Sequence, residues 1–342
     1  MDSLTHITLG ACLGEAMLGR SIGTKALVLG AVAQSLPDVD GLAALWLSTT
    51  DNLLAHRGLT HSLPVGGLVA GGLALLARRW WPRVSVGYWF LFFALQIGVH
   101  DLLDTTNAYG TGLLEPFSHR RFSVHLLYVA DPFFTLPLLI AGCVLVFGRG
   151  RLPTRFAGAL SALVVSLGYV GYAYVNKSRT ESAIRHSLAA QHIQSTAYFT
   201  TPTPFNAWLW YTVVASGNGY YVGYRSVFEP RDVLTRFTYF PRRDALLAKT
   251  DDSVAVAALK RFANGYYTVE RRGGAATSDT LRFNVLRFGQ VLGWQQPAAP
   301  FAFQYWLGPN FDNRLVVQRG RVTGWNVATL RKMYRRILAN RK

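Results

Sequence analysis

Histidines and aspartates gather in two short strings that lie beside long apolar runs. The first string covers residues 56–62 (HRGLTHS) and the second covers residues 100–104 (HDLLD). Imidazole and carboxylate groups together favour zinc or another borderline divalent ion, and no cysteine nearby supplies a structural thiolate site. The strings therefore predict a metal site of the open, catalytic kind.

Spacing within the strings indicates which residues share an ion. His100 and Asp104 are four residues apart, so on a helix their side chains share one face, one turn apart. The alternative is an ordinary hydrogen-bonded pair within that helix. His56 and His61 are five apart, which a regular helix would not superpose, so we expect only one to bind directly. We favour His61, which immediately precedes an apolar span.

Other polar residues extend this set. Asp38 and Asp40 follow Pro37 in a turn, where one carboxylate can bind metal while the other acts as a base; helix capping is the alternative. The guanidinium of Arg57 can clamp a phosphate, or it can simply reach toward lipid headgroups. The predicted metal ligands are His6, Asp38, His56, His61, His100 and Asp104, and the predicted catalytic residues are Asp38, Asp40 and Arg57.

The apolar runs predict a mainly α-helical, multi-pass membrane domain over residues 1–176. Runs 6–19 and 24–36 are each shorter than the roughly 20 residues that a span requires, so they predict a helical hairpin. That hairpin would bring His6 and the turn after residue 36 to the same end. Further apolar runs cover residues 63–77, 84–103, 132–148 and 156–175.

Basic residues predict the orientation of these helices. The connections on one side contain Arg20, Lys25, Arg78, Arg79, Arg83, Arg149, Arg151 and Arg155. The positive-inside rule makes this side cytoplasmic, which places every candidate ligand at the opposite face. We therefore predict a multi-pass protein of a bacterial inner membrane, with the site and the C-terminal domain on the periplasmic face.

Residues 177–342 have the pattern of a smaller α+β extramembrane domain. Apolar runs 208–216 and 220–228 flank an Asn-Gly turn, which is a strong β-hairpin signal. Asp251 or Asp252 can cap a helix that ends near residue 262. Further strands are predicted at 266–271, 281–288, 301–307 and 314–322, and a basic helix at 325–342.

Charge is distributed unevenly between the two parts. The net charge is +17, of which +2 belongs to residues 1–176 and +15 to residues 177–342. A basic extramembrane domain indicates anionic partners. No helix-turn-helix, zinc-finger or single-strand-binding signature is present, so we expect anionic membrane lipids and no nucleic acid. Cys12 and Cys143 both lie in apolar segments and predict no disulfide.

Taken together, the motifs resemble a known family. Thr5-His6, the turn at 37–40, the strings at 56–62 and 100–104, and the Asp131-Pro132 step resemble the YdjM-like family of inner-membrane proteins, assigned largely by motif as metal-dependent hydrolases. A remoter similarity to zinc-dependent phospholipase C implies ligands at His6, His61, His100 and Asp104, with Asp38 as a ligand or base. Because no downstream HxxxE pair follows, this similarity implies one or two metals.

The leading hypothesis is a membrane-bound metal-dependent hydrolase. It would act on a phosphoester or another ester of a lipid-like substrate at the membrane surface, with zinc as the expected ion and manganese or iron as alternatives. A second hypothesis is a non-catalytic membrane protein that binds metal and anionic lipid or a partner protein. A third treats the His and Asp residues as a hydrogen-bonded network without metal. Transport is disfavoured because the polar residues collect at one face.

Overall fold

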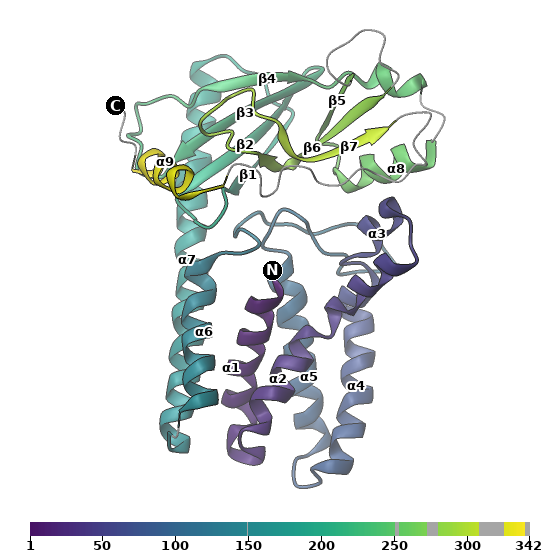
Figure 1. The fold of residues 1–342 in the computed structure, drawn as a ribbon, viewed down its shortest axis with the longest axis vertical. Coiled ribbons are helices and arrows are strands. Elements are labelled where there is room, and N and C mark those ends of the chain that lie inside the picture. Colours follow the sequence, from purple (N-terminus) through teal and green to yellow (C-terminus); the bar gives the residue numbers. More distant parts are fainter. Residues whose placement is uncertain (149, 250–252, 272–279, 308–324, 339–342) are drawn as a thin grey trace. The chain divides into compact units, whose positions relative to one another are not determined.

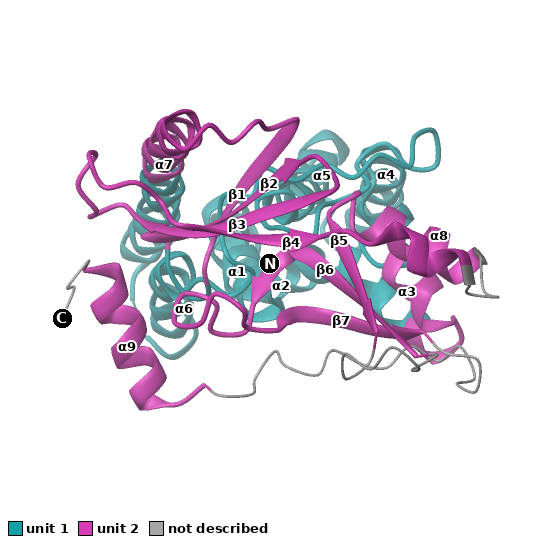
Figure 2. Ribbon diagram, turned by 90° about the horizontal axis from the view of Figure 1, so that it is seen from above, with its two compact units in different colours: residues 1–43, 55–174, 204–206 teal, residues 44–54, 175–203, 207–342 magenta. Residues whose placement is uncertain are grey.

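Helices form the first half of the chain, and all seven described strands lie in the second half. The structure, a computed structural model, describes residues 1–148, 150–249, 253–271, 280–307 and 325–338. The chain forms two compact units, coloured separately in Figure 2. The first contains residues 1–43, 55–174 and 204–206, and the second contains residues 44–54, 175–203 and 207–342.

The helical half consists of α-helices (Figure 1), with a 3-10 segment on either side of α3. Its elements are α1 (Ser3–Ile22), α2 (Lys25–Ser35), η1 (Pro37–Leu45), α3 (Thr49–Ala55), η2 (Leu59–His61), α4 (Leu63–Trp80), α5 (Val86–Asp104), α6 (Pro132–Phe147) and α7 (Leu152–Ala190). Side-chain oxygens cap several of the starts, as at Ser62 for α4, Ser85 for α5 and Asp131 for α6. These caps explain why the apolar runs begin as helices where they do.

Two of the described helices, α5 and α7, are long and apolar enough to cross a membrane. A third candidate arises if the segment Thr49–His61 and α4, which meet at a 53° bend, together form one span. Helix α6 is apolar but shorter. The predicted fold class, a helical membrane region followed by an α+β region, is confirmed.

The predicted hairpin of α1 and α2 packs through glycines. A Cβ atom built on Gly30 would lie 2.1 Å from the carbonyl oxygen of Gly10, and one on Gly10 would lie 2.4 Å from that of Gly30. Because the obstacles are backbone atoms, the two helices can approach this closely only without side chains. This contact holds α1, and with it His6, beside the rest of the first unit.

We expect Gly30→Ala to destabilise the protein, although alanine is the better helix former by about 1 kcal/mol. The clash with the Gly10 carbonyl should lower the free energy of unfolding by about 1–3 kcal/mol. Gly71→Ala in α4 is the matched control, since a Cβ there meets nothing within 4 Å. Thermal unfolding in detergent measures both variants, and equal midpoints for the two would contradict the packing argument.

Helix α7 differs from the expected element at both ends. It extends to Ala190 rather than ending near residue 175, because Ile184 and Leu188 are buried against Val214 of the second unit. Arg155, expected in a loop, lies inside the first turns of α7. Its guanidinium forms two hydrogen bonds of 2.9 Å with the carboxylate of the buried Glu15 on α1.

The second unit contains two antiparallel sheets. The strands β1 (Ala197–Pro202), β2 (Leu209–Ser216), β3 (Gly219–Ser226) and β4 (Phe237–Pro241) lie in that order, and β5 (Tyr267–Arg271), β6 (Leu281–Gln290) and β7 (Phe301–Leu307) form the other sheet. The remaining elements are η3 (Asp244–Lys249), α8 (Ser253–Phe262) and α9 (Val327–Ile337). A cluster that includes Tyr211, Val222, Leu286 and Phe301 packs side chains from both sheets together.

The hairpin predicted around the Asn-Gly turn is confirmed as β2 and β3. Val213 pairs with Val222, and the turn closes at Ser216 and Gly219 with Gly217 at a φ of +53°. Strands β1 and β4 were not predicted, since their segments lack a clear alternation of apolar and polar residues. The predicted cap at Asp251 or Asp252 and the strand at 314–322 lie outside the described residues.

Candidate metal centre

Four side chains from three elements of the first unit meet in one group. Asp38 comes from η1, His61 from η2, and His100 and Asp104 from the last turns of α5. Each offers one ligand atom, and these atoms all lie within 4.8 Å of one another. His61, His100 and Asp104 are fully buried, whereas the side chain of Asp38 is 25% exposed. The group therefore lies below the surface with one carboxylate at its opening.

The distances within the group suit a small cation. The Nε2 atoms of His61 and His100 are 3.1 Å apart. Oδ1 of Asp38 lies 3.6 and 3.7 Å from these two nitrogens, and Oδ2 of Asp104 lies 3.5 and 3.8 Å from them. Ligands placed about 2.0–2.2 Å from a tetrahedral ion lie roughly 3.3–3.6 Å apart. The observed separations bracket that range.

Hydrogen bonds at the far side of each imidazole orient the two histidines. Nδ1 of His100 lies 2.6 Å from the carbonyl oxygen of Gln34, and Nδ1 of His61 lies 3.1 Å from Oδ2 of Asp40. A carbonyl or carboxylate oxygen only accepts, so each Nδ1 carries the proton and a neutral ring has its Nε2 lone pair free. Metal-binding histidines are commonly held in this way. Two such lone pairs 3.1 Å apart repel unless a cation or a proton lies between them.

Asp40 acts on the group through its neighbours. Its Oδ2 accepts hydrogen bonds from the backbone N–H of Arg57 at 2.7 Å and from the Thr60 hydroxyl at 3.0 Å, and its Oδ1 lies 2.9 Å from Nδ1 of His56. Burial alone would raise the pKa of Asp40, but hydrogen bonds with His56 and His61 outweigh it and hold the pKa well below its usual range. Asp40 is therefore an anion that orients His61.

We expect Asp40→Asn to weaken metal binding without abolishing it. The amide has the shape of the carboxylate but lacks the charge that supports His61, so affinity should fall about 10–100-fold. Stoichiometry at saturating metal should stay unchanged, because all four ligand side chains are retained. Titration with a metal-indicator dye measures both quantities. Asp51→Asn, on an exposed residue of α3, is the matched control, and an equal loss in the control would contradict the prediction.

Arg57 brings positive charge to the buried Asp104. Its Nε lies 2.7 Å from Oδ2 of Asp104, and its terminal nitrogens donate to Oδ1 of Asn107 at 2.9 Å and to the carbonyl of Met1 at 3.3 Å. Arg57 has a φ of +58°, a left-handed conformation that side chains disfavour by roughly 1–2 kcal/mol. The hydrogen bond from its backbone N–H to Asp40 helps to hold this conformation.

The other predicted ligands lie beside the group. His6 stacks on the ring of His100 with a centroid distance of 3.7 Å, and its Nε2 lies 3.3 Å from Oδ1 of Asp104, which also pairs with the Met1 amino group. The side chain of His56 is 32% exposed and contacts Asp40. The structure thus gathers Asp38, His61, His100 and Asp104 into one group. His6 contacts two members of this group, whereas His56 contacts Asp40, which lies beside it.

Sequence reasoning missed two partners of this group. Gln34 contributes its backbone carbonyl to His100, and Asn107 contributes its side chain to Arg57. A backbone carbonyl leaves no sequence signal, because every residue has one. Asn107 follows the second string by three residues, and a polar side chain so close to a charged string was the available signal.

Comparison with known proteins identifies the family. The model of the YdjM inner membrane protein family matches residues 1–180, which is more than half of the chain. The chain belongs to the YdjM inner membrane protein family. The predicted resemblance is thereby confirmed. All four residues of the Asp38, His61, His100 and Asp104 group lie within the matched region.

Two relatives extend this assignment. The inner membrane protein YbcI of Escherichia coli (strain K12) is 33% identical over 121 residues, covering 35% of this chain and 69% of YbcI. The uncharacterized protein YfhP of Bacillus subtilis (strain 168) is 27% identical over 266 residues, covering 75% of this chain and 78% of YfhP. No solved structure matches the chain. The chain is therefore an inner membrane protein of the YdjM family, with a few candidate spans and a buried Asp/His/His/Asp group that could hold a metal ion.

Proposed function

We propose that this YdjM family protein is a metal-dependent hydrolase that cleaves a phosphoester or another ester of a lipid-like substrate at the membrane surface. The observation that carries the proposal is the group of Asp38, His61, His100 and Asp104, whose ligand atoms lie within 4.8 Å of one another. Zinc suits two imidazoles and two carboxylates best, with manganese or iron as alternatives. A divalent ion bound there would supply Lewis-acid chemistry, lowering the pKa of water and polarising an ester oxygen.

Of the two carboxylates that could take a proton from water, Asp38 has the better position. Its side chain is 25% exposed, so water and substrate can reach it. Asp40 already uses both oxygens in contacts with His56, Arg57 and Thr60. We therefore assign Asp38 to ligand binding or proton transfer at the opening, and Asp40 to holding His61.

Arg57 supplies the positive charge that a hydrolase of anionic esters needs. It already balances Asp104 at 2.7 Å, so the group as a whole is not strongly negative before substrate enters. A guanidinium next to a reacting ester also offsets negative charge that develops on the ester oxygens. Its burial makes this effect stronger than it would be in water.

Apolar side chains next to the ligands support a lipid-like substrate. Val39 lies between Asp38 and Asp40 in the sequence and is 53% exposed, and Leu42 on the same turn is 55% exposed. Leu59 and Leu63, each two residues from His61, are 53% and 47% exposed. Exposed apolar groups beside a polar opening are typical of surfaces that contact lipid or other apolar ligands.

Hydrolysis is tested with purified, metal-loaded protein in detergent. Release of phosphate or alcohol from p-nitrophenyl phosphate, bis-p-nitrophenyl phosphate and short-chain anionic phospholipids is followed for wild type and His61→Ala. His119→Ala is the matched control, because His119 is 67% exposed and forms its ion pair with Glu115, which is not part of the group. Turnover in wild type and the control that is lost in His61→Ala supports the proposal. Stoichiometric metal without turnover of any ester favours instead the non-catalytic metal-binding role.

We also propose that the site faces the periplasm. Arg20, Lys25, Arg78 and Arg79 lie at helix ends opposite the ligand-bearing turns, and Arg83 lies in the connection between α4 and α5. This is the arrangement that the positive-inside rule predicts. Leu45→Cys and Glu115→Cys, made after Cys143→Ala, should react with a membrane-impermeant thiol reagent added to intact cells. Labelling only after the cells are opened would place the site on the cytoplasmic face.

A further inference from the structure

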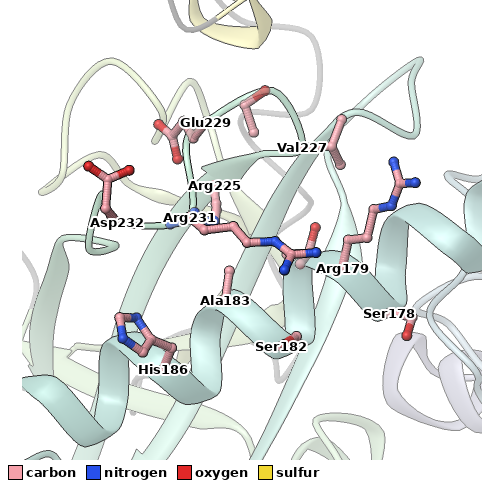
Figure 3. Close-up of a pocket in the computed structure, with 12 residues that line it drawn as sticks. Ser178, Arg179, Ser182, Ala183, His186, Arg225, Val227, Glu229, Arg231 and Asp232 are labelled. Atoms are coloured by element: carbon pink, nitrogen blue, oxygen red, sulfur yellow. The ribbon is translucent and has the colours of Figure 1, made fainter.

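A polar cavity lies wholly within the second unit. It measures about 820 Å³ and is lined by one face of α7, from Ser178 to His186, and by the end of β3 with the start of the loop that leads to β4, from Arg225 to Asp232. Figure 3 shows Arg231 extending from this loop toward the side of α7 that carries Arg179 and Ser182. None of the residues that line the cavity belongs to the metal-binding group, and the cavity has no part in the proposed hydrolysis.

Positive charge in this cavity is only partly balanced. Neither Arg179 nor Arg231 forms a hydrogen bond or ion pair with any described residue, and both are exposed to the cavity. Two carboxylates also line it, but Glu229 accepts a hydrogen bond from Arg336 at 2.5 Å, which leaves Asp232 as the remaining negative charge. Both guanidiniums therefore keep donors free to bind an anion that enters the cavity.

A third arginine holds the loop beside the cavity by hydrogen bonds. Arg225 is buried, and its terminal nitrogens donate to the carbonyl oxygens of Pro230 at 2.8 Å and Val233 at 2.6 Å. Burial is the main cause of a lowered pKa for Arg225, as expected for a cation whose contacts are neutral oxygens. The loop is also fastened to α7, because the Thr235 N–H donates to the Ser187 hydroxyl at 3.0 Å. These contacts hold the loop in place before any ligand arrives.

The depth of the cavity along α7 indicates the source of the anion. Residues 156–175 contain no charged side chain, and at 1.5 Å per residue their 20 positions extend about 30 Å, the thickness of the hydrocarbon core. Arg179 follows Val175 by four residues, which adds about 6 Å and reaches the headgroup layer. We propose that this cavity binds the phosphate group of an anionic membrane lipid through Arg179 and Arg231.

The test measures binding and requires no hydrolysis, so it fails or succeeds independently of the proposed enzyme activity. The full chain in a neutral detergent is titrated calorimetrically with dioctanoyl phosphatidylglycerol and, separately, with inorganic phosphate. The double variant Arg179→Gln/Arg231→Gln should bind the lipid about tenfold more weakly or worse. The matched control is Arg331→Gln/Arg335→Gln, which removes two exposed charges from α9 and should change affinity by less than about twofold.

Each outcome bears on the proposal. The proposal is supported if Arg179→Gln/Arg231→Gln loses lipid binding and the control variant retains it. If wild type binds inorganic phosphate as strongly as the lipid, the ligand of the same cavity is a free phosphate compound. Arg179→Lys/Arg231→Lys retains the charge but loses the planar fork, so it should fall between wild type and the glutamine variant even if the latter folds poorly. Equal losses in the pocket and control variants, or no binding of either probe by wild type, would overturn the proposal.

Discussion

Protein with His100→Ala or Asp104→Ala should be purified without metal, while wild type carries roughly one divalent ion per chain. Both side chains project from the last turns of α5 into the group that also contains Asp38 and His61. Removing a residue that hydrogen-bonds to a metal ligand weakens metal binding by about 10–100-fold. Removing a ligand itself should therefore weaken metal binding by more than about 100-fold. Elemental analysis by mass spectrometry measures the bound ion directly.

Two controls separate loss of metal from loss of fold. Asp104→Asn retains the shape of the side chain and its position beside Arg57, so it should lose metal while its elution from a sizing column stays that of wild type. His119→Ala removes an exposed histidine of the loop after α5 and should retain the full metal content. Equal, substoichiometric metal in wild type and all variants would favour the hydrogen-bonded network over a metal site.

Replacement of Arg57 should have the largest effect on stability, and added metal should reverse part of it. Arg57→Gln leaves the fully buried Asp104 without the guanidinium that lies 2.7 Å away. Breaking a buried ion pair by removing one partner lowers the free energy of unfolding by about 3–5 kcal/mol. A divalent ion beside Asp104 would replace the lost positive charge. The variant should therefore unfold far earlier than wild type in chelator and recover more than wild type when zinc is added.

Thermal unfolding in detergent, with chelator or with zinc, measures both the loss of stability in Arg57→Gln and its recovery with metal. Arg83→Gln is the control, since Arg83 is an exposed residue before α5 with no described partner, and its midpoint should shift by the equivalent of less than about 0.5 kcal/mol. An Arg57→Gln midpoint equal to that of Arg83→Gln in chelator would show that the stability of the fold does not depend on the pairing of Arg57 with Asp104. If zinc does not reduce the shift in the Arg57→Gln unfolding midpoint, Arg57 does not act together with the metal-binding group.

The position of the group at the ends of helices explains how a membrane protein tolerates it. A charged side chain at the centre of a span is disfavoured by roughly 2.5–3.5 kcal/mol, but Asp104 is the last residue of α5. Asp38 and His61 lie on short 3-10 turns rather than within a long apolar helix. These groups are therefore buried by protein packing and not by lipid. Contacts among them offset the cost of burying their charges, since Arg57 and the Met1 amino group both pair with Asp104.

Features that depend on a few neighbouring residues could be predicted from the amino-acid sequence. The spacing of His100 and Asp104 correctly places them on one face of α5, because a helix repeats every 3.6 residues whatever surrounds it. The Gly217-Asn218-Gly219 step likewise predicted the β2–β3 hairpin, although the two turn residues are Gly217 and Asn218 and Gly219 already pairs with Ser216. The family motifs are similarly local and were confirmed. Of the predicted spans, α5 and α7 are long and apolar enough to cross a membrane, and a bent pair is a third candidate.

Features that depend on distant partners required the folded chain. The roles of Asp38 and Asp40 looked interchangeable in the sequence, yet one lies at the opening of the group and the other holds His61 by a contact across 21 positions. The Gln34 carbonyl that orients His100 and the Arg57 contact with Asp104 are also long-range. Such pairings arise when packing of whole elements brings backbone and side chains together, and no local repeat encodes them.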